Sequence, residues 1–552
     1  MIKNNLKQIL ILIALAYIFF MFGNSIVSLT NPDEVFYAQT AKEMAQRNSW
    51  MTMYMFDTPQ FEKPIFLYWC MRISSFIFKN ENFAARFPPS FFAILGIVAV
   101  YYLSLLGFKD KKKAFISGLI MMSSGLYVGL ARTVFTDMIF SVLILFSLLS
   151  FYWGYEVRNR KKHAILLFYV FAALAVLAKG PLGLFVPLII VLAFLLIKKD
   201  LKFFFCRYSL WGFLLFLAIS FPWYIFMMSK YGHSFNREFF YNDHFRRLIE
   251  AEHLENDTWY FYPVSMIGGM FPWSLYVFFS LILLFKRLKP QVNPIYIFLA
   301  SWLGITFLIF QPAHSKLASY IFPLFPALAI VAGDFVSNNI APKETSRLFF
   351  VISLATALVF MIFPPGFIFA ITKFSSYLSN RTPVYVFIIA LSILALAILI
   401  SVLRRRFLKA IYLMSLFMFL FLFLIPFVKK DADPYLSSKE ACDYLMKNHE
   451  VKNRILCSKF FSRGVRYYTN MNVAVMDYPG KNFFSPHPIP FYNNDTQIRD
   501  FLRSQIVTFA VLKKSAIEDI ERITGKEMKF KVLKIVGNEY VLKIEPAGNP
   551  TE

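Results

Sequence analysis

Apolar segments long enough to cross a lipid bilayer recur throughout the first 428 residues of this chain. A helix rises about 1.5 Å per residue, so roughly 20 apolar residues cross about 30 Å of hydrocarbon. Hydrophobic residues make up 58% of the 552 residues, more than a soluble domain needs for its core. We therefore expect a polytopic α-helical membrane protein. About thirteen spans are predicted, at residues 6–27, 88–107, 114–131, 137–155, 164–179, 181–197, 208–228, 262–285, 293–311, 317–336, 348–372, 383–403 and 408–428.

Basic residues are distributed unevenly between the predicted links. Lys3 and Lys7 precede a first span that is too long, and too poor in a small-residue cleavage site, for a removed signal peptide, so we expect an uncleaved anchor. With a cytoplasmic N-terminus, every second link faces the cytoplasm, and positive residues near span ends resist translocation. These links carry the dense Lys/Arg clusters, at residues 109–113, 158–163, 198–207, 286–289 and 404–409. The net charge of +25 is therefore mainly topological and indicates anionic lipid, with no nucleic acid partner.

The composition changes near residue 428, beyond which shorter helical and strand-like patterns alternate. We divide the chain into a transmembrane domain, residues 1–428, and a small extracytoplasmic α/β domain, residues 429–552. An odd number of spans places this second domain on the same outer side as the loops at residues 28–87 and 229–261. Helices are predicted at residues 437–448 and 496–503, and strands at residues 454–458, 473–476, 507–512, 529–535 and 540–544.

The first outer loop opens with an acidic pair. Asp33 and Glu34 follow Pro32 at the start of a predicted helix that also contains Tyr37. Helix N-termini favour negative charge, so the pair could simply stabilise an interfacial helix. A catalytic reading needs further polar groups on the same face.

Two further groups of polar residues lie on the same predicted face. Glu62 and Lys63 precede Pro64 and an aromatic segment, although Lys63 could also be an ordinary interfacial anchor that extends toward water. Arg132 and Asp137 lie in the very short outer link between the third and fourth spans, where they could instead pair with each other.

Three more groups lie on the same predicted face. They are the turn at residues 179–181, the loop at residues 241–247 with a later histidine, and the segment at residues 314–323. Their candidate site residues are Lys179, His244, Arg246, Arg247, His253, Lys316 and Tyr320. Each group alone is weak evidence of a site. Six groups that combine paired acids with several cations on one face predict a shared active site.

These motifs resemble those of the membrane-embedded GT-C glycosyltransferases of the protein O-mannosyltransferase superfamily. The most similar branch is the bacterial lipid A aminoarabinose (4-amino-4-deoxy-L-arabinose) transferases. The order and spacing of the motifs agree from the acidic pair to Pro326, and the architecture of about thirteen spans with an outer α/β domain agrees as well. Two features depart from the pattern: Ile65 stands where a second proline is common, and the spacing from His253 to Trp259 differs slightly.

The resemblance implies an inverting glycosyltransferase that moves a sugar from a polyprenyl-phosphate donor to a lipid A-like glycolipid or another extracytoplasmic acceptor. It implies Asp33 as the general base, with Asp137 as a second carboxylate that orients the sugar or the acceptor. Lys63 and Arg247 are the expected phosphate clamp, with Arg246 as an alternative, because lysine supplies a point charge and arginine a planar fork. The expected substrate-binding residues are Glu34, Tyr37, Glu62, Arg132, Lys179, His244, His253, Lys316 and Tyr320.

No obligatory cofactor or metal is expected. Glu62 and His244 could hold a divalent ion, but two ligands without a third make a poor site. Cys442 and Cys457 either form a disulfide in an oxidising compartment or remain two buried thiols, and the sequence leaves both possibilities open.

The resemblance also implies a location and partners. We expect a monomer in the bacterial inner membrane with its active site and its α/β domain on the periplasmic side. The expected partners are membrane lipid, the polyprenyl-phosphate sugar and a glycolipid or polysaccharide acceptor. The competing functions are a flippase for lipid-linked sugars, a protein O-glycosyltransferase and a scaffold. Transporters place ionisable residues near the bilayer midplane, whereas these motifs lie at the ends of spans. The sugar and the acceptor stay open.

Overall fold

The structure is a computed structural model that describes residues 5–250, 254–288, 293–340, 346–478, 480 and 489–547. The chain forms two compact units. We call Met1–Asn24, Glu62–Cys70 and Arg86–Ile425 the helical unit, and Ser25–Phe61, Met71–Ala85 and Pro426–Glu552 the sheet unit. The predicted boundary at residue 428 lies close to the last of these divisions. The first outer loop, however, belongs mainly to the sheet unit rather than to the transmembrane domain.

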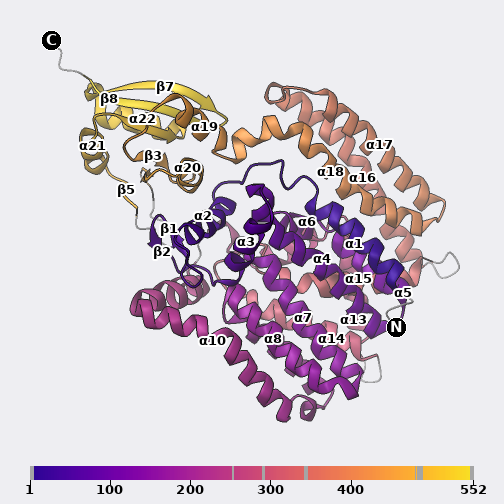
Figure 1. Cartoon of the computed structure of the whole chain (residues 1–552). Helices are drawn as coiled ribbons and strands as arrows, with labels where there is room; N and C mark the ends of the chain where they lie inside the picture. The colour runs from indigo at the N-terminus through magenta and orange to yellow at the C-terminus, as the bar shows by residue number, and fades with distance from the viewer. Residues whose placement is uncertain are drawn as a thin grey trace. The chain divides into compact units, whose positions relative to one another are not determined.

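The helices of the first 436 residues are connected mostly by short links (Figure 1). They are α1 (Leu6–Met21), α2 (Asp33–Gln46), α3 (Phe66–Ile77), α4 (Glu81–Phe108), α5 (Lys111–Met122), α6 (Gly125–Ala131), α7 (Thr136–Glu156), α8 (Lys161–Lys179), α9 (Leu182–Ile197), α10 (Arg207–Phe235), η4 (Asn236–Arg246), α11 (Arg247–Ile249), α12 (Phe261–Gly269), α13 (Ser274–Lys286), α14 (Pro294–Phe310), α15 (Phe325–Asn339), α16 (Arg347–Phe374), α17 (Thr382–Leu403) and α18 (Phe407–Leu436).

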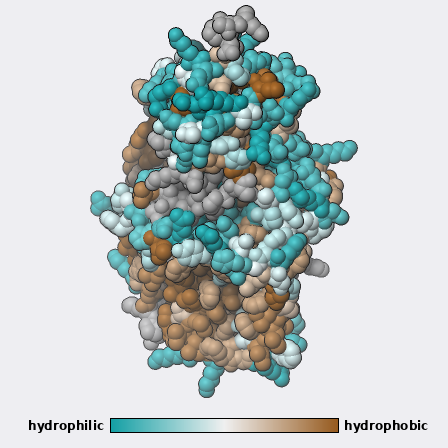
Figure 2. Space-filling model, turned by 90° about the vertical axis from the view of Figure 1, so that its left-hand side faces the viewer, coloured by the Kyte–Doolittle hydropathy of each residue, from teal (hydrophilic) through white to brown (hydrophobic). Residues whose placement is uncertain are grey.

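Seven helices in the described residues are long and apolar enough to cross a membrane, and nine spans result if each of two bent pairs counts as one. The remaining predicted spans coincide with the shorter helices α1, α9, α14 and α15. Large hydrophobic side chains such as Leu210, Trp211 and Ile225 are exposed on α10, and Figure 2 shows a broad hydrophobic surface on one face of the molecule. The chain is therefore a multi-pass helical membrane protein, while the count of thirteen spans stays a prediction.

Two spans that were predicted as continuous helices are broken, so this prediction was wrong. The span predicted at residues 114–131 consists of α5 and α6, which meet at 66°, and the span at residues 262–285 consists of α12 and α13, which meet at 117°. The hydroxyls of Ser123 and Ser124 donate to the carbonyls of Leu119 and Ile120 at the first break, and such bonds bend helices. Pro272 lies at the second break and has no amide hydrogen to donate.

Helix ends and crossings follow from the local sequence. Asp110 caps α5 by accepting from the amides of Lys112 and Lys113, which satisfies groups without intrahelical partners. Close crossings use small residues, as is common between membrane helices. A β-carbon on Gly333 of α15 would lie 2.9 Å from the Cα of Ser117 in α5, so these two backbones can approach closely only because residue 333 is glycine.

The sheet unit contains a six-stranded sheet in the order β5-β4-β3-β6-β8-β7, of which Figure 1 labels β3, β5, β7 and β8. Strands β5, β4, β3 and β6 are parallel, whereas β8 and β7 form an antiparallel edge. The elements are β1 (Tyr54–Met55), β2 (Thr58–Pro59), α19 (Lys439–Asn448), β3 (Ile455–Ser458), α20 (Ser462–Thr469), β4 (Val473–Met476), β5 (Phe491–Tyr492), α21 (Asp495–Arg503), β6 (Thr508–Leu512), α22 (Lys514–Thr524), β7 (Met528–Val536) and β8 (Glu539–Pro546).

The core of this sheet is apolar and continuous. Buried side chains of β3, β4, β6 and β8 pack with α21 and α22, as Leu456, Ile498 and Ile520 illustrate. The α/β character of this region is confirmed, and each predicted helix and strand corresponds to an observed one within a few residues. Cys442 and Cys457 are free and buried, so the possibility of a disulfide between them is not realised.

Candidate active site

Helices α7 and α8 each carry a charged residue where they meet. Asp137 lies in the first turn of α7, and Lys179 is the last residue of α8. The negative charge of Asp137 lies at the positive N-terminal end of the α7 dipole, and the positive charge of Lys179 lies at the negative C-terminal end of the α8 dipole, so both are favourable. Gly180 follows with a φ of 105°, a conformation that glycine adopts without strain and that lets the chain turn directly into α9. Lys179 Nζ lies 2.5 Å from Asp137 Oδ1, and the two side chains are 18% and 7% exposed.

A second carboxylate is contributed by η4, a π-helical segment that extends from α10. Asp243 in this segment lies four residues before Arg247, and its Oδ1 is 3.1 Å from Arg247 Nε. Its Oδ2 accepts a hydrogen bond from Lys63 Nζ at 2.5 Å. One buried carboxylate therefore fixes two cations that are 184 residues apart in the sequence.

Tyr320 joins the two ion pairs. Arg247 Nη1 donates a hydrogen bond to the hydroxyl of Tyr320 at 2.6 Å, and Lys179 Nζ lies 4.6 Å from the centre of the same ring. A cation over an aromatic face is attracted by the electron density of the ring. The phenol thus contacts one cation through its oxygen and another through its face.

We call Lys63, Lys179 and Arg247 the cation cluster. Its three positive charges meet two negative charges, on Asp137 and Asp243, so the formal sum is +1. None of the five side chains is more than 18% exposed. A mostly buried excess of positive charge is unfavourable unless an anion completes it. The arrangement is chemically suited to a phosphate group, which arginine can bind through its fork and lysine as a point charge.

Lys316 belongs to a neighbouring polar group. Its Nζ donates to Asp257 Oδ1 at 2.8 Å, and His314 Nδ1 lies 2.8 Å from Asp257 Oδ2. Two hydrogen bonds hold the pKa of Asp257 below its ordinary value. The one from Lys316 has the larger effect, and the one from His314 adds to it. The amide of Ser315 donates to the carbonyl of Arg247 at 3.1 Å, so this group is attached directly to the cation cluster.

Three predicted site residues lie in the sheet unit. Asp33 is the first residue of α2; its side chain is 54% exposed, and its Oδ1 lies 3.7 Å from Arg463 Nη1. Glu34 is buried and accepts hydrogen bonds from the amide and the hydroxyl of Thr30 at 3.0 and 2.9 Å. Tyr37 is buried against Phe36. These contacts show that Glu34 and Tyr37 take part in local packing and hydrogen bonding. Their roles in substrate binding stay predictions.

Two arginines have partners outside the cation cluster. Arg132 Nη1 donates to the carbonyl of Phe19 at 2.9 Å, and Asp137 is bonded to Lys179. The local pairing of Arg132 with Asp137 that the sequence suggested as an alternative is therefore wrong. Arg246 Nε lies 2.6 Å from Glu250 Oε2 at a partly exposed position, whereas its neighbour Arg247 points to the buried acid.

The remaining predicted residues are Glu62, His244 and His253. Glu62 lies beside Lys63 in the segment before α3. His244 is part of η4, but its side chain is outside the described part of the structure, and His253 lies outside the described residues altogether. No group of three or more His, Cys, Asp or Glu side chains in the described part of the chain could hold a metal ion.

Asp243 contacts two cations of the cluster but is not among the site residues predicted from the sequence. The loop at residues 241–247 was predicted as part of the site, but substrate or phosphate binding was assigned only to His244, Arg246 and Arg247. An acid four residues before an arginine on a helix is a recognisable pairing signal. That spacing would have identified Asp243 as the partner of Arg247, but not as the partner of Lys63.

Comparison with known proteins shows that the chain is similar to sugar transferases. A family model described as dolichyl-phosphate-mannose-protein mannosyltransferase matches residues 62–226. A curated undecaprenyl phosphate-alpha-4-amino-4-deoxy-L-arabinose arabinosyl transferase from Photorhabdus laumondii is 30% identical over 314 residues, which cover 56% of this chain and 55% of the relative. The protein of the same name from Yersinia pestis is 30% identical over 359 residues, which cover 62% of each chain. The chain thus spans somewhat more than half the length of these relatives.

Solved structures show the fold. The crystal structure of ArnT from Cupriavidus metallidurans bound to undecaprenyl phosphate matches with a TM-score of 0.76 and 17% identity, and the match covers 97% of both chains. The chain has the ArnT fold. This fold combines a multi-pass helical region with a C-terminal sheet, as the sequence predicted. The family model and the named relatives agree with the resemblance that the motifs indicated. Within the ArnT fold, Lys63, Asp137 and Lys179 fall inside the region matched by the mannosyltransferase family model.

Proposed function

We propose that the chain is an inverting glycosyltransferase that moves a sugar from a polyprenyl-phosphate donor to an extracytoplasmic acceptor. The observation that carries the proposal is the cation cluster, in which three mostly buried cations share two carboxylates. The names of the curated relatives and the ArnT fold support the same activity. By analogy with the names of those relatives, the sugar is 4-amino-4-deoxy-L-arabinose. The acceptor that we propose, a lipid A-like glycolipid, follows from the resemblance of the motifs.

The cation cluster acts on the leaving group. When the bond between the anomeric carbon and the phosphate oxygen breaks, negative charge accumulates on the phosphate. Preorganised cations in a site with little water stabilise that charge without reorganising. In this proposal Lys63 and Arg247, the expected phosphate clamp, bind the phosphate together with Lys179. Asp243 and Asp137 are positioning residues that fix these three cations. The proposed role of Asp137 is therefore to hold Lys179, in place of the expected role of orienting the sugar or the acceptor.

Asp33 is the proposed general base. A base must accept the proton of the acceptor hydroxyl or amine as that atom attacks the anomeric carbon from the face opposite the phosphate, which inverts the configuration. The side chain of Asp33 at the start of α2 is 54% exposed, which supports its access to such an acceptor. Since cations supply the stabilisation of the phosphate, we propose that no metal is obligatory. We also propose thirteen spans in a bacterial inner membrane, with the site and the sheet facing the periplasm, and a monomeric protein.

The test is transfer by the purified full chain. Undecaprenyl phosphate 4-amino-4-deoxy-L-arabinose and lipid A are incubated with the protein in detergent, with and without EDTA, and the products are identified by mass spectrometry. Modified lipid A and free undecaprenyl phosphate are expected in both conditions. Glycosylated protein in place of lipid A would favour a protein O-glycosyltransferase. Movement of the donor across vesicles without any transfer would favour a flippase.

Single substitutions distinguish the proposed role of Asp33 as the base from that of Lys63 in phosphate binding. Asp33→Asn should abolish transfer but leave donor binding intact, because the amide cannot accept the proton. Lys63→Ala should weaken donor binding. Full transfer activity of Asp33→Asn would reject the assignment of the base without affecting the assignment of the cation cluster.

A further inference from the structure

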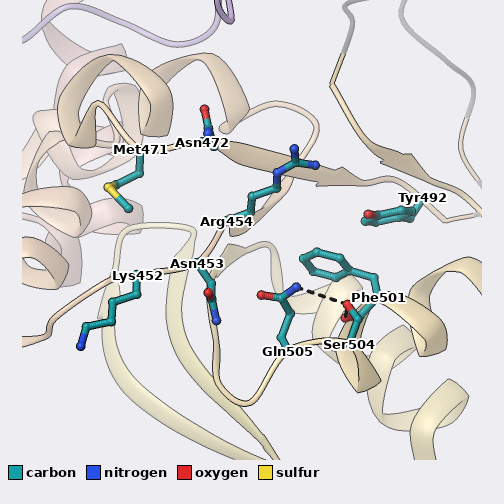
Figure 3. A pocket seen from close by; sticks show the side chains of 9 residues that line it. All are labelled: Lys452, Asn453, Arg454, Met471, Asn472, Tyr492, Phe501, Ser504 and Gln505. Atoms are coloured by element: carbon teal, nitrogen blue, oxygen red, sulfur yellow. Dashed lines mark hydrogen bonds between the residues drawn. The ribbon is translucent and has the colours of Figure 1, made fainter.

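A pocket of about 440 Å³ lies in the sheet unit, at the edge where the parallel strands β3 and β4 begin (Figure 3). This volume is within the range of small-molecule sites, which is roughly 300–1,000 Å³. Arg454 and Asn472, the residues before β3 and β4, contribute to its wall together with residues of β5 and the end of α21. The proposed transfer reaction uses none of these side chains.

An aromatic pair forms one wall. The rings of Tyr492 in β5 and Phe501 in α21 are 4.9 Å apart with an interplanar angle of 33°. Phe501 is buried and packs in the core, which holds the more exposed ring of Tyr492 in place. An exposed aromatic face fixed by packing offers a flat apolar surface. The C–H face of a sugar ring matches such a surface.

Amide groups provide directed hydrogen bonds. Arg466 Nη1 donates to Asn472 Oδ1 at 3.0 Å. Since arginine only donates, the other end of this amide is the NH2 group, which leaves Asn472 as a donor toward the pocket. Asn453 Nδ2 donates to the carbonyl of Val507 at 3.3 Å, which leaves its oxygen as an acceptor. A donor and an acceptor with fixed identities suit the hydroxyl groups of a sugar.

The charge of the pocket is positive. The guanidinium of Arg454 extends toward the side of the pocket that holds Tyr492 (Figure 3). It forms no hydrogen bond or ion pair with the residues that the structure describes. Burial raises the pKa of the Tyr492 phenol and the nearby charge of Arg454 lowers it, with a net increase. Lys452 adds a second cation to the lining, and no acidic side chain takes part in that lining among the described residues.

We propose that this pocket binds a phosphorylated sugar. The sugar ring stacks on Tyr492, its hydroxyl groups bond to Asn453 and Asn472, and its phosphate binds the guanidinium of Arg454. The site is separate from the cation cluster, and it would add a saccharide-binding function to the sheet unit. The proposal does not depend on the proposed transfer, because binding is measured without a polyprenyl donor.

The test is calorimetric titration of the full chain in detergent with glucosamine 1-phosphate, at low salt. Saturable binding is expected. Arg454→Gln should weaken it by about tenfold or more, as expected for a hydrogen bond to a charged group. Tyr492→Leu should weaken it as well, whereas Tyr492→Phe retains the ring and should bind normally. Lys514→Gln, at an exposed lysine of α22 outside the pocket, is the matched control and should have no effect.

Three outcomes would overturn the proposal. One is the absence of saturable binding by the wild-type chain. Another is equal binding of inorganic phosphate and glucosamine 1-phosphate, which would remove the role of the sugar ring. The third is binding that is lost in Lys63→Ala but retained in Arg454→Gln, which would assign the ligand to the cation cluster. Binding retained in Lys63→Ala and lost in Arg454→Gln supports the pocket.

Discussion

Asp243 holds two cations of the cluster, so its replacement should affect catalysis through them. Without its carboxylate, Lys63 and Arg247 lose a shared partner at 2.5 and 3.1 Å. Displacement of catalytic groups by about 1 Å can reduce a rate roughly 100-fold. We expect Asp243→Ala to lower kcat/KM for transfer by about that factor, and Asp243→Asn, which keeps one acceptor oxygen, to lower it less. Steady-state assays with the polyprenyl donor measure both.

Arg246→Gln is the matched control for this prediction. Arg246 pairs with Glu250 at a partly exposed position, and such pairs are worth about 0.2–1 kcal/mol. Its replacement should leave kcat/KM nearly unchanged. Wild-type activity in Asp243→Ala would show that Asp243 does not position the cation cluster. A large loss in Arg246→Gln would show that the wrong arginine has been assigned to the phosphate.

Glu539 should make the stability of the sheet unit depend on pH. Burial raises the pKa of this carboxyl to about 7 from an ordinary value of 4.5, and a hydrogen bond from Ser438 lowers it in part. The folded state therefore retains a proton between these pH values that the unfolded state has released. Stability is full below the unfolded value and is lost as pH rises to about 7, by on the order of 3 kcal/mol. Glu539→Gln should abolish this loss.

Thermal unfolding at pH 5 and pH 8 measures the effect of Glu539. The wild-type chain should lose more stability between these two pH values than Glu539→Gln does. An identical change in the wild-type and variant chains would mean that the buried carboxyl does not control this dependence.

Partners distant in sequence explain which parts of the site the sequence could not predict. The charged motifs were each recognisable, because they lie at the ends of apolar segments. Their pairing was not, since Lys63 and Asp243 are 180 residues apart and Asp137 bonds to Lys179, 42 residues away, rather than to the nearby Arg132. The phosphorylated-sugar pocket escaped prediction for the same reason, because its wall is assembled from several short segments.

Helices α5, α13, α14 and α15 are joined by one acid at their ends. Asp334 of α15 lies 2.5 Å from Lys113 Nζ and 2.8 Å from Arg287 Nη1, and it accepts a hydrogen bond from the hydroxyl of Tyr296 at 2.9 Å. Removal of one partner from a buried ion pair costs about 3–5 kcal/mol, because the other charge stays buried. We expect Asp334→Ala to lower the melting temperature in detergent by several degrees.

Asp200→Ala provides the comparison for Asp334→Ala. Its pair with Arg158 is more exposed, at 31% and 54%, so its loss should change the melting temperature little. Equal destabilisation by the two substitutions would indicate that the network around Asp334 does not hold the helix ends together.

Hydropathy and periodicity predicted most elements, and the two helix breaks and the short strand β5 escaped prediction for physical reasons. A hydropathy window sums over residues and does not detect a bend, so the breaks between α5 and α6 and between α12 and α13 were missed. Strand β5 has only two residues and is too short to show a period. Helix α22 was missed although Ile517, Ile520 and Ile523 repeat every three residues, which is a helical spacing.

The two units of the molecule are not contiguous in sequence. Hydrogen bonds within the sheet unit connect Ser28 with Asp433 and Lys42 with Tyr467, and an ion pair joins Arg466 to Asp57 at 2.6 Å. These partners are about 400 residues apart, so a division based on composition could not find them. The proposed base, Asp33, thus belongs to the unit that carries the sheet, whereas the cation cluster belongs to the helical unit.

The distribution of basic loops predicts which side of the membrane each region faces. Cysteine scanning tests this topology in cells whose outer membrane is permeabilised and whose inner membrane is intact. The background variant carries serine in place of Cys70 and Cys206, which are partly exposed. Lys514→Cys in α22 should react with a membrane-impermeant maleimide at once. Lys199→Cys, in the basic link after α9, should react only after the inner membrane is opened, because positive residues near span ends resist translocation. Immediate labelling of residue 199 with protection of residue 514 would place the sheet and the proposed active site on the cytoplasmic side.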